Sequence, residues 1–99
     1  MSTAGEERLA RIRQFMDERQ WKYTFKTDEG CGVLEFLYRD RAYHIWEFED
    51  DDGSFGAESN VRTCGRMEDY TGDYEEEILH VIRGWLLDEK RAEHRDRQW

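Results

Sequence analysis

Hydrophobic and polar residues alternate with two different periods along this chain. Residues 21–26 alternate aromatic and polar side chains one by one, in the order Trp-Lys-Tyr-Thr-Phe-Lys. A period of two is typical of a β-strand, whose successive side chains point to opposite faces. Residues 74–86 instead carry apolar side chains three and four positions apart, at Tyr74, Ile78, Val81, Ile82, Trp85 and Leu86. That spacing predicts an amphipathic helix.

Helices are therefore expected at both ends of the chain. The first covers about Ala4–Arg19 and has a narrow apolar stripe at Leu9, Ile12 and Met16. The second runs from Asp73 to about Leu87. Each begins with a capping box, in which two side chains satisfy free amides at the helix start: Thr3 with Glu6, and Asp73 with Glu76.

Four strands are predicted between the helices, at about Trp21–Lys26, Val33–Arg39, Ala42–Glu49 and Ser54–Arg62. Asp40-Arg41 leaves room for a two-residue hairpin. Asp50–Gly53 is a stronger turn, because Asp tolerates left-handed backbone geometry and Gly supplies a positive φ. Cys64–Gly72 is predicted to be a loop.

The predicted fold class is α+β: a helix, a four-stranded antiparallel meander and a second helix, with both helices packed on the sheet. A chain of 99 residues has room for a single domain, residues 1–99. Residues 88–99 are mostly charged, so we expect a C-terminal extension that either continues the helix into solvent or frays.

Both faces of the predicted sheet contain apolar residues. With Asp40-Arg41 as the turn, Leu37 opposes His44. One face then carries Val33, Leu37, Trp46, Phe48 and Phe55, and the other carries Leu34, Phe36, Tyr38, Tyr43 and Ile45. Two helices fully cover only one face of such a sheet. The alternatives are that one face stays partly open, that helices cover both faces, that the chain dimerises, or that a bulge folds both sets into one core.

The charge imbalance is confined to one segment. Residues 47–77 contain twelve acidic and two basic residues, a net charge of −10, whereas the other 68 residues have a net charge of +1. Glu75, Glu76 and Glu77 fall in the first turn of the second helix, where the helix dipole stabilises carboxylates. Asp73 is explained as the cap of the same helix. The helix start does not explain why the other acidic residues are concentrated in this segment.

We expect these remaining acids to form a surface that binds a basic partner. A concentrated negative field raises association rates and makes binding sensitive to salt. Two aromatic residues of the third strand are added because an exposed apolar patch often marks an interface. The predicted partner-binding residues are Glu47, Glu49, Asp50, Asp51, Asp52, Glu68 and Asp69, together with Trp46 and Phe48. The alternative is an acidic surface that serves only solubility.

The sequence contains no motif for catalysis, for a cofactor or for a metal, so none of these sites is predicted. Asp50–Gly53 resembles part of a calcium-binding loop, but the loop's first and last ligand positions fall on Phe48 and Ser59. Cys31 and Cys64 lack the spacing of a zinc site and are too few for a disulfide framework.

Composition also limits which cellular compartment and which class of binding partner are expected. No run of 18 apolar residues occurs, and no apolar signal region follows Met1–Gly5, so we expect a cytoplasmic protein that does not engage a membrane. The net charge of −9 argues against direct nucleic-acid binding, which requires a basic surface. The expected partner is a basic protein surface, such as that of a nucleic-acid-binding protein, and a homodimer is a further option.

A short acidic domain with a small sheet and flanking helices resembles the anti-CRISPR and anti-restriction proteins of phages and mobile elements, which imitate the charge of DNA. The resemblance rests on the acidic groups Glu47–Asp52 and Glu68–Glu77 and on the order of elements. It implies a non-enzymatic inhibitor that occupies a nucleic-acid site on its target. The chain departs from the most acidic DNA mimics, whose charge covers most of their surface.

Two other function classes are compatible with the sequence. A small ligand-binding or enzymatic domain would use an aromatic-lined pocket between sheet and helices, formed by Trp21, Tyr23, Trp46 and Trp85. A self-associating structural domain would bury the second apolar face of the sheet against another copy.

Overall fold

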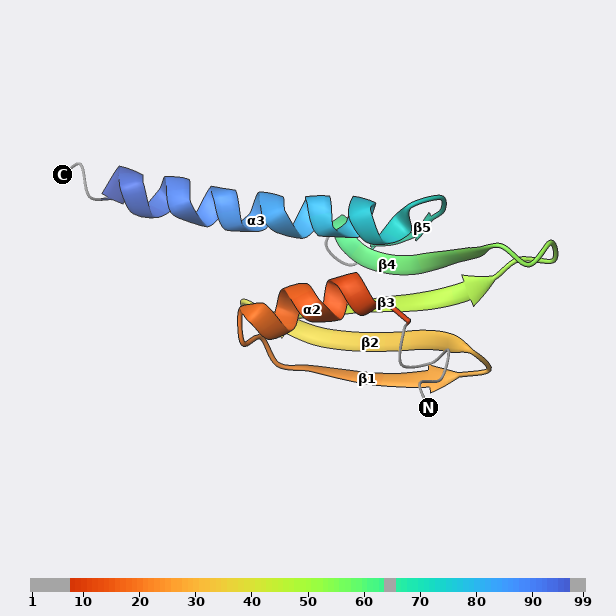
Figure 1. The fold of residues 1–99 in the computed structure, drawn as a ribbon. Helices are drawn as coiled ribbons and strands as arrows, with labels where there is room; N and C mark the ends of the chain where they lie inside the picture. Colours follow the sequence, from red (N-terminus) through yellow and green to blue (C-terminus); the bar gives the residue numbers. More distant parts are fainter. Residues whose placement is uncertain (1–7, 64–65, 97–99) are drawn as a thin grey trace.

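The computed structural model describes residues 8–63 and 66–96, with side chains described as far as Glu89 except for that of Thr63. Within this part the chain forms two helices and five strands, in the order α2 (Ala10–Glu18), β1 (Tyr23–Asp28), β2 (Cys31–Tyr38), β3 (Arg41–Glu49), β4 (Phe55–Thr63), β5 (Arg66–Tyr70) and α3 (Tyr74–Asp96) (Figure 1). The strands form one antiparallel sheet in the order β1-β2-β3-β4-β5. The predicted α+β class is confirmed.

The predicted strand number is wrong by one, because β5 lies in the segment that the sequence predicted as a loop. In the structure Ala57 pairs with Tyr70 and Glu58 pairs with Asp69. Tyr70 is only 2% exposed and anchors the end of the strand in the core. The other four residues of β5 are exposed or half-buried, so the strand has no apolar alternation that would have predicted it.

The two helix starts differ in how far they follow the sequence prediction. The capping box of Thr3 and Glu6 lies outside the described residues. In the described part α2 begins after Leu9, which has a left-handed backbone (φ 52°) and a buried side chain. The cap of α3 is confirmed, since Asp73 accepts a hydrogen bond from the backbone N–H of Glu76 at 3.4 Å.

Helix α3 continues to Asp96, so its C-terminal part extends past the end of the sheet (Figure 1). Of the two alternatives for the C-terminal extension, continuation of the helix is observed as far as Asp96, and residues 97–99 lie outside the described part.

The turn between β2 and β3 is one residue earlier than predicted. Tyr38 pairs with Arg41, so Arg39 and Asp40 form the two-residue loop, with φ values of 53° and 66°. Two successive positive φ values are the geometry of a primed hairpin turn. Arg does not favour that geometry, which is why the sequence did not point to this turn. Leu37 therefore opposes Ala42 rather than His44, but the side chains keep the predicted faces because the pairing shifts by two residues.

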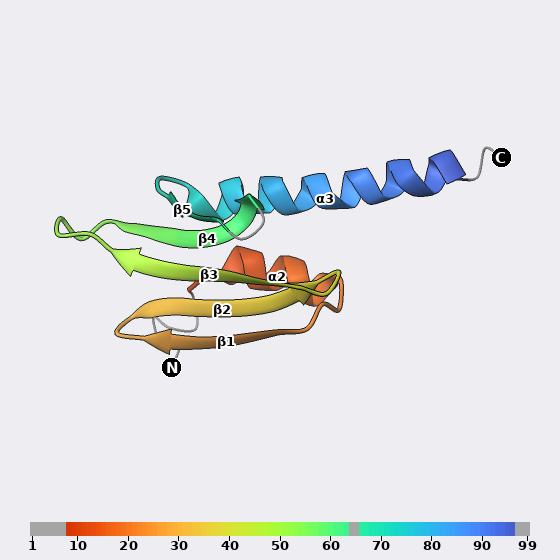
Figure 2. The ribbon, with the colours of Figure 1, turned by 180° about the vertical axis from the view of Figure 1, so that it is seen from behind.

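Both helices pack on the same face of the sheet, here called the helix face. Helix α2 passes in front of the strands in Figure 1 and behind them in Figure 2. The core between the helices and this face consists of Leu9, Ile12, Phe15, Met16, Leu34, Phe36, Tyr43, Ile45, Ala57, Val61, Tyr70, Ile78, Leu79 and Ile82. No described helix or strand covers the other face, here called the open face. Of the arrangements considered from the sequence, the one with an open face is therefore observed.

One residue was assigned to the wrong face. Phe55 pairs with Glu49, which shares its orientation with the buried residues Ile45 and Glu47. Phe55 therefore lies on the helix face, where the Arg8 guanidinium stacks over its ring at 4.0 Å. The error arose because the length of the β3–β4 turn decides which residues of β4 face the core.

Candidate interaction surface

The open face presents apolar side chains from the two central strands to solvent. Along β2 and β3, residues alternate with the buried set, which leaves Val33, Glu35, Leu37, Ala42, His44, Trp46 and Phe48 on this face. Leu37 is 68% exposed and Trp46 is 37% exposed. Exposed apolar residues on one face of a sheet often mark a binding surface.

Trp46 is held by its neighbours rather than free to rotate. Its ring packs on that of His44 with centroids 4.2 Å apart, and the His44 Nε2 atom lies 3.6 Å from a carboxylate oxygen of Glu58. The backbone N–H of His44 donates a hydrogen bond to the Asn60 side chain at 3.0 Å. A pre-ordered aromatic ring loses less conformational entropy on binding, which favours its use as an anchor.

Phe48 is less exposed than Trp46 because a glycine lies beneath it. Gly56 pairs with Phe48 across β3 and β4, and a Cβ at position 56 would approach the Phe48 ring to 2.6 Å. The glycine therefore lets the ring lie flat on the sheet. Of the two predicted aromatic contact residues, Trp46 presents the larger accessible surface.

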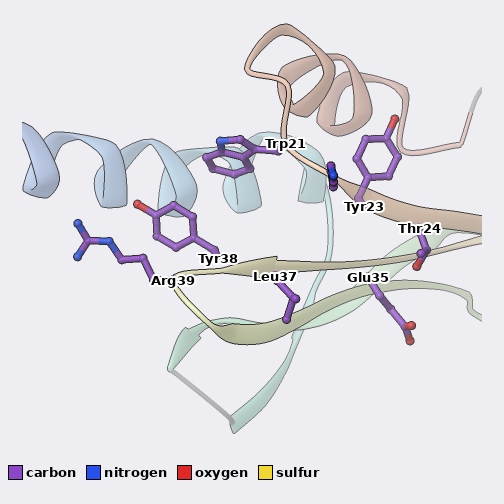
Figure 3. Close-up of a pocket in the computed structure, with 8 residues that line it drawn as sticks. Trp21, Tyr23, Thr24, Glu35, Leu37, Tyr38 and Arg39 are labelled. Carbon is purple, nitrogen blue, oxygen red and sulfur yellow. The ribbon is translucent and has the colours of Figure 1, made fainter.

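Two shallow hollows adjoin this surface. One, of about 480 Å³, lies on the open face and is lined by residues that include Glu35, Leu37, Ala42, His44 and Trp46. The other, of about 550 Å³, lies at the edge of the sheet and is lined by Trp21, Lys22, Tyr23, Thr24, Glu35, Leu37, Tyr38 and Arg39 (Figure 3). In Figure 3, Trp21 and Tyr38 lie on one side of the strands, whereas Leu37 and Glu35 point to the other.

The aromatic-lined pocket predicted between sheet and helices does not form from the four residues named for it. Trp46 lies on the open face, whereas Trp85 packs on the helix face against Tyr38 and Tyr43, with ring centroids 4.8 and 4.7 Å apart. Trp21 stacks on the same group at 5.3 Å from Tyr38. These rings therefore pack against one another on the helix face, and of the four residues named for the pocket, Trp21 and Tyr23 line the edge hollow.

The acidic turn between β3 and β4 is well ordered by its own hydrogen bonds. Asp50 N–H donates to the Ser54 carbonyl at 2.8 Å, and Gly53 N–H donates to the Asp50 carbonyl at 2.9 Å. The Asp52 carboxylate accepts hydrogen bonds from both the N–H and the hydroxyl of Ser54, at 3.0 and 2.7 Å. Those bonds lower the pKa of Asp52, the backbone bond most. Asp52 therefore has a structural role in the turn.

Glu49, Asp50 and Asp51 are exposed at the end of the strand that carries Trp46 and Phe48. Glu49 shares the orientation of Ile45 and Glu47, so the four-residue group Trp46, Phe48, Asp50 and Asp51 is here called the docking surface. The structure thus brings together most of the predicted partner-binding residues of β3 and its turn.

Glu47 does not belong to this surface. Its side chain is 1% exposed, and it lies on the helix face with Ile45. Its carboxylate accepts two hydrogen bonds from Arg8 at 2.8 and 3.0 Å, one from the Tyr74 hydroxyl at 2.6 Å, and one from the Gly32 N–H at 2.8 Å. A buried carboxylate with this many donors is satisfied internally and is unavailable to a partner. The alternation of β3 already indicated this, since positions 43, 45 and 47 share one face.

The remaining two predicted acids are separated from the turn. Asp69 is exposed and pairs with Glu58 across β4 and β5, which places it on the open face. Glu68 is half-buried, and its carboxylate lies 3.3 Å from the Arg62 guanidinium. Asp69 extends the acidic surface across the sheet, whereas Glu68 is partly neutralised.

The acids at the start of α3 are also used internally. Glu75 accepts hydrogen bonds from the backbone N–H groups of Arg11 and Ile12 at 3.0 and 3.3 Å, so it caps α2 from the neighbouring helix. The Arg11 side chain pairs with Asp73, and this contact lowers the pKa of that carboxyl group. Asp73 and Glu75 therefore connect the start of α3 to α2, in addition to the favourable position of such acids at a helix start.

Neither a metal centre nor a membrane-spanning helix is found in the described part of the chain. Within residues 8–63 and 66–96, no three His, Cys, Asp or Glu side chains group closely enough to hold a metal ion. In the same residues, no helix has the length and apolar character needed to cross a membrane.

Comparison with known proteins yields no relative: no family model, no curated protein and no solved structure matches this chain significantly.

Proposed function

We propose that this protein is a non-enzymatic interaction module that binds a basic site on a larger protein through the docking surface. The observation that supports this most is the continuity along β3: an exposed, pre-ordered Trp46 on the open face is followed, at the end of the same strand, by exposed Asp50 and Asp51. An apolar anchor beside a charged rim is the usual composition of a protein–protein interface.

The two parts of the docking surface have different tasks. Trp46 and Phe48 supply apolar area, which dominates binding energy once it is removed from water. The acidic turn attracts a basic partner over a distance of about 10 Å at ordinary salt, and it mainly raises the association rate. Charge complementarity of this kind also selects against acidic partners.

A nucleic-acid-binding site is the kind of basic surface that we favour as the target. Such sites present clustered Lys and Arg side chains arranged to meet closely spaced negative charges. Consecutive carboxylates at positions 50 and 51 present closely spaced negative charges on an exposed turn. Binding there would exclude the nucleic acid and make the protein an inhibitor.

The proposal is tested by capture of partners from host-cell extract at low and at high salt, with two charge-reversal variants. Asp50→Lys/Asp51→Lys reverses the turn but spares Asp52, which holds the turn together. Glu18→Lys/Asp88→Lys is the matched control, since both residues are exposed, lie outside the docking surface and change the net charge equally. We expect the first variant to lose the partner and the control to retain it.

A second measurement separates the apolar and the charged contributions. Trp46→Ser should weaken binding at both salt concentrations, because loss of apolar area does not depend on ionic strength. A partner bound with equal affinity at low and high salt, or one retained by the Asp50→Lys/Asp51→Lys variant, would contradict the proposal.

A further inference from the structure

Strand β1 is an uncovered edge of the sheet. Among the described strands it pairs with β2 alone, and in both views no described helix or strand lies beyond it (Figures 1 and 2). An edge strand of six residues presents a row of backbone N–H and C=O groups that another strand is able to pair with. Natural edges are normally protected against such pairing, so the side chains of β1 decide what this edge accepts.

The charges along β1 are arranged unevenly. On the open face the side chains are Lys22, Thr24, Lys26 and Asp28, where Lys22 immediately precedes the strand, and on the helix face they are Tyr23, Phe25 and Thr27. Lys22 and Asp28 lie at opposite ends, about 20 Å apart in an extended chain. They therefore cannot pair within one molecule, and among the described side chains neither has an ion-pair partner.

A second copy of the chain fits this edge in one register only. A two-fold axis perpendicular to the sheet pairs β1 antiparallel with itself and keeps the helices of both copies on one side. Opposed residues must then share a face, so the axis passes through a residue near the middle of the strand: Thr24, Phe25 or Lys26. An axis at Thr24 opposes Lys22 to Lys26 of the second copy, and an axis at Lys26 opposes the two Lys26 side chains. Both registers place like charges opposite each other, which destabilises a strand pair.

The remaining register, with the axis at Phe25, opposes no like charges of the two β1 strands, and the Arg13 guanidinium lies over each Phe25 ring at 4.0 Å. It opposes Lys22 to Asp28 of the second copy twice, once on each side of the axis. It also opposes Thr24 to Lys26, and it brings the two Phe25 rings together on the helix face. Opposite-charge and aromatic cross-strand pairs are among those that stabilise sheets.

We propose that this chain forms a symmetric homodimer in which the two β1 edges pair antiparallel about Phe25 and join the two sheets into one of ten strands. The dimer is independent of the proposed function, because the docking surface on β3 stays accessible. Lys22, which would oppose Asp28 of the second copy, is one of the residues that line the edge hollow.

The first test exchanges the two charges and measures the dimer dissociation constant of the full chain by sedimentation equilibrium. Lys22→Asp and Asp28→Lys each place two like-charge pairs in the interface, so each should weaken the dimer by about tenfold or more. The double variant Lys22→Asp/Asp28→Lys restores two opposite-charge pairs and should return the dissociation constant to within about threefold of the original. Because the residues are too far apart to pair within one molecule, rescue identifies an intermolecular contact. Lys26→Asp, with the same net charge as Lys22→Asp, is the matched control and should have a smaller effect.

The second test fixes the register. In a Cys31→Ser/Cys64→Ser background, Phe25→Cys should form an intermolecular disulfide under mild oxidation, because directly opposed residues have Cα atoms about 4.5–5.5 Å apart. Thr24→Cys is the control: in this register the two Thr24 positions are offset by two residues and lie beyond disulfide reach. Circular dichroism of each variant checks that the fold is retained.

Two results would overturn the dimer. The first is a protein that remains monomeric at a concentration of about 200 µM, well above a micromolar dissociation constant. The second is a dimer whose dissociation constant is unchanged by the single charge exchanges or is not restored by the double variant. A dimer that cross-links through Thr24→Cys as readily as through Phe25→Cys would count equally against the proposal. That outcome would place self-association elsewhere, for example on the open face.

Discussion

The Tyr74 hydroxyl donates a 2.6 Å hydrogen bond to Glu47, which ties the first residue of α3 to the middle of the sheet. The same carboxylate binds Arg8, just before α2, and the Gly32 N–H in β2. One buried acid therefore connects both helices to two neighbouring strands.

Removal of the Glu47 carboxylate should destabilise the fold strongly. Glu47→Ala leaves the partly buried Arg8 guanidinium and the Gly32 N–H without an acceptor, so we expect a loss of about 3 kcal/mol in the free energy of unfolding. Urea denaturation measures this loss. Glu49→Ala, an exposed residue on the same strand, is the control and should change stability by less than about 0.5 kcal/mol.

Tyr74 should make the fold sensitive to alkali. Burial and the contact with Glu47 raise its pKa well above the ordinary value of 10.0. The folded state therefore holds the phenol proton more tightly than the unfolded state does. This contribution to stability is complete below pH 10 and is lost as pH rises above it. Unfolding measured from pH 8 to pH 11 should show a decline that is smaller in Tyr74→Phe; equal declines would mean that Tyr74 is not the group responsible.

Two glycines should respond in opposite directions to replacement by alanine. Gly53 has a φ of 86° in the acidic turn, so Gly53→Ala should cost about 1 kcal/mol of stability. Gly84 lies inside α3, and apart from its chain neighbours and the backbone of its own helix no described atom lies within 4 Å of an added Cβ, so Gly84→Ala should stabilise the protein by about 1 kcal/mol. Thermal unfolding of the two variants side by side provides the check. A stabilising Gly53→Ala would show that the turn does not need a left-handed residue.

Leucines on the two faces of β2 should also differ. Leu37→Ser on the open face should leave stability within about 0.5 kcal/mol, whereas Leu34→Ala in the core should cost about 2–5 kcal/mol. Chemical denaturation of both variants tests which face is the core. A large loss in Leu37→Ser would mean that the open face is covered in solution.

Much of the fold followed from the alternation of side chains. The strand patterns and the apolar spacing of α3 predicted four of the five strands and that helix, and they grouped Leu34 with Ile45 on one sheet face, which the structure identifies as the core. β5 was missed because its only buried side chain is Tyr70. The β2–β3 turn was placed one residue too late because the two residues with left-handed backbone geometry, Arg39 and Asp40, are not glycines.

The candidate surface was predictable only in part. The charge of residues 47–77 was visible in the sequence, but charge alone does not indicate which carboxylates are buried. Glu47 and Glu75 look like their neighbours in composition, and only the contacts with Arg8 and with the start of α2 show that they are structural. The pairing of Lys22 with Asp28 of a second copy could not be predicted from the sequence either, because the sequence does not show that β1 is the outermost strand.

The Glu47 site also bears on the order in which the chain becomes stable as it is synthesised. Arg8 and Tyr74 are 39 and 27 residues away from Glu47 along the chain. A nascent chain that has emerged only as far as β4 holds this carboxylate in the middle of its sheet before Tyr74 can reach it. Contacts of long sequence separation form late and slow folding. The sheet should therefore become protease-resistant only after the first turn of α3 has left the ribosome.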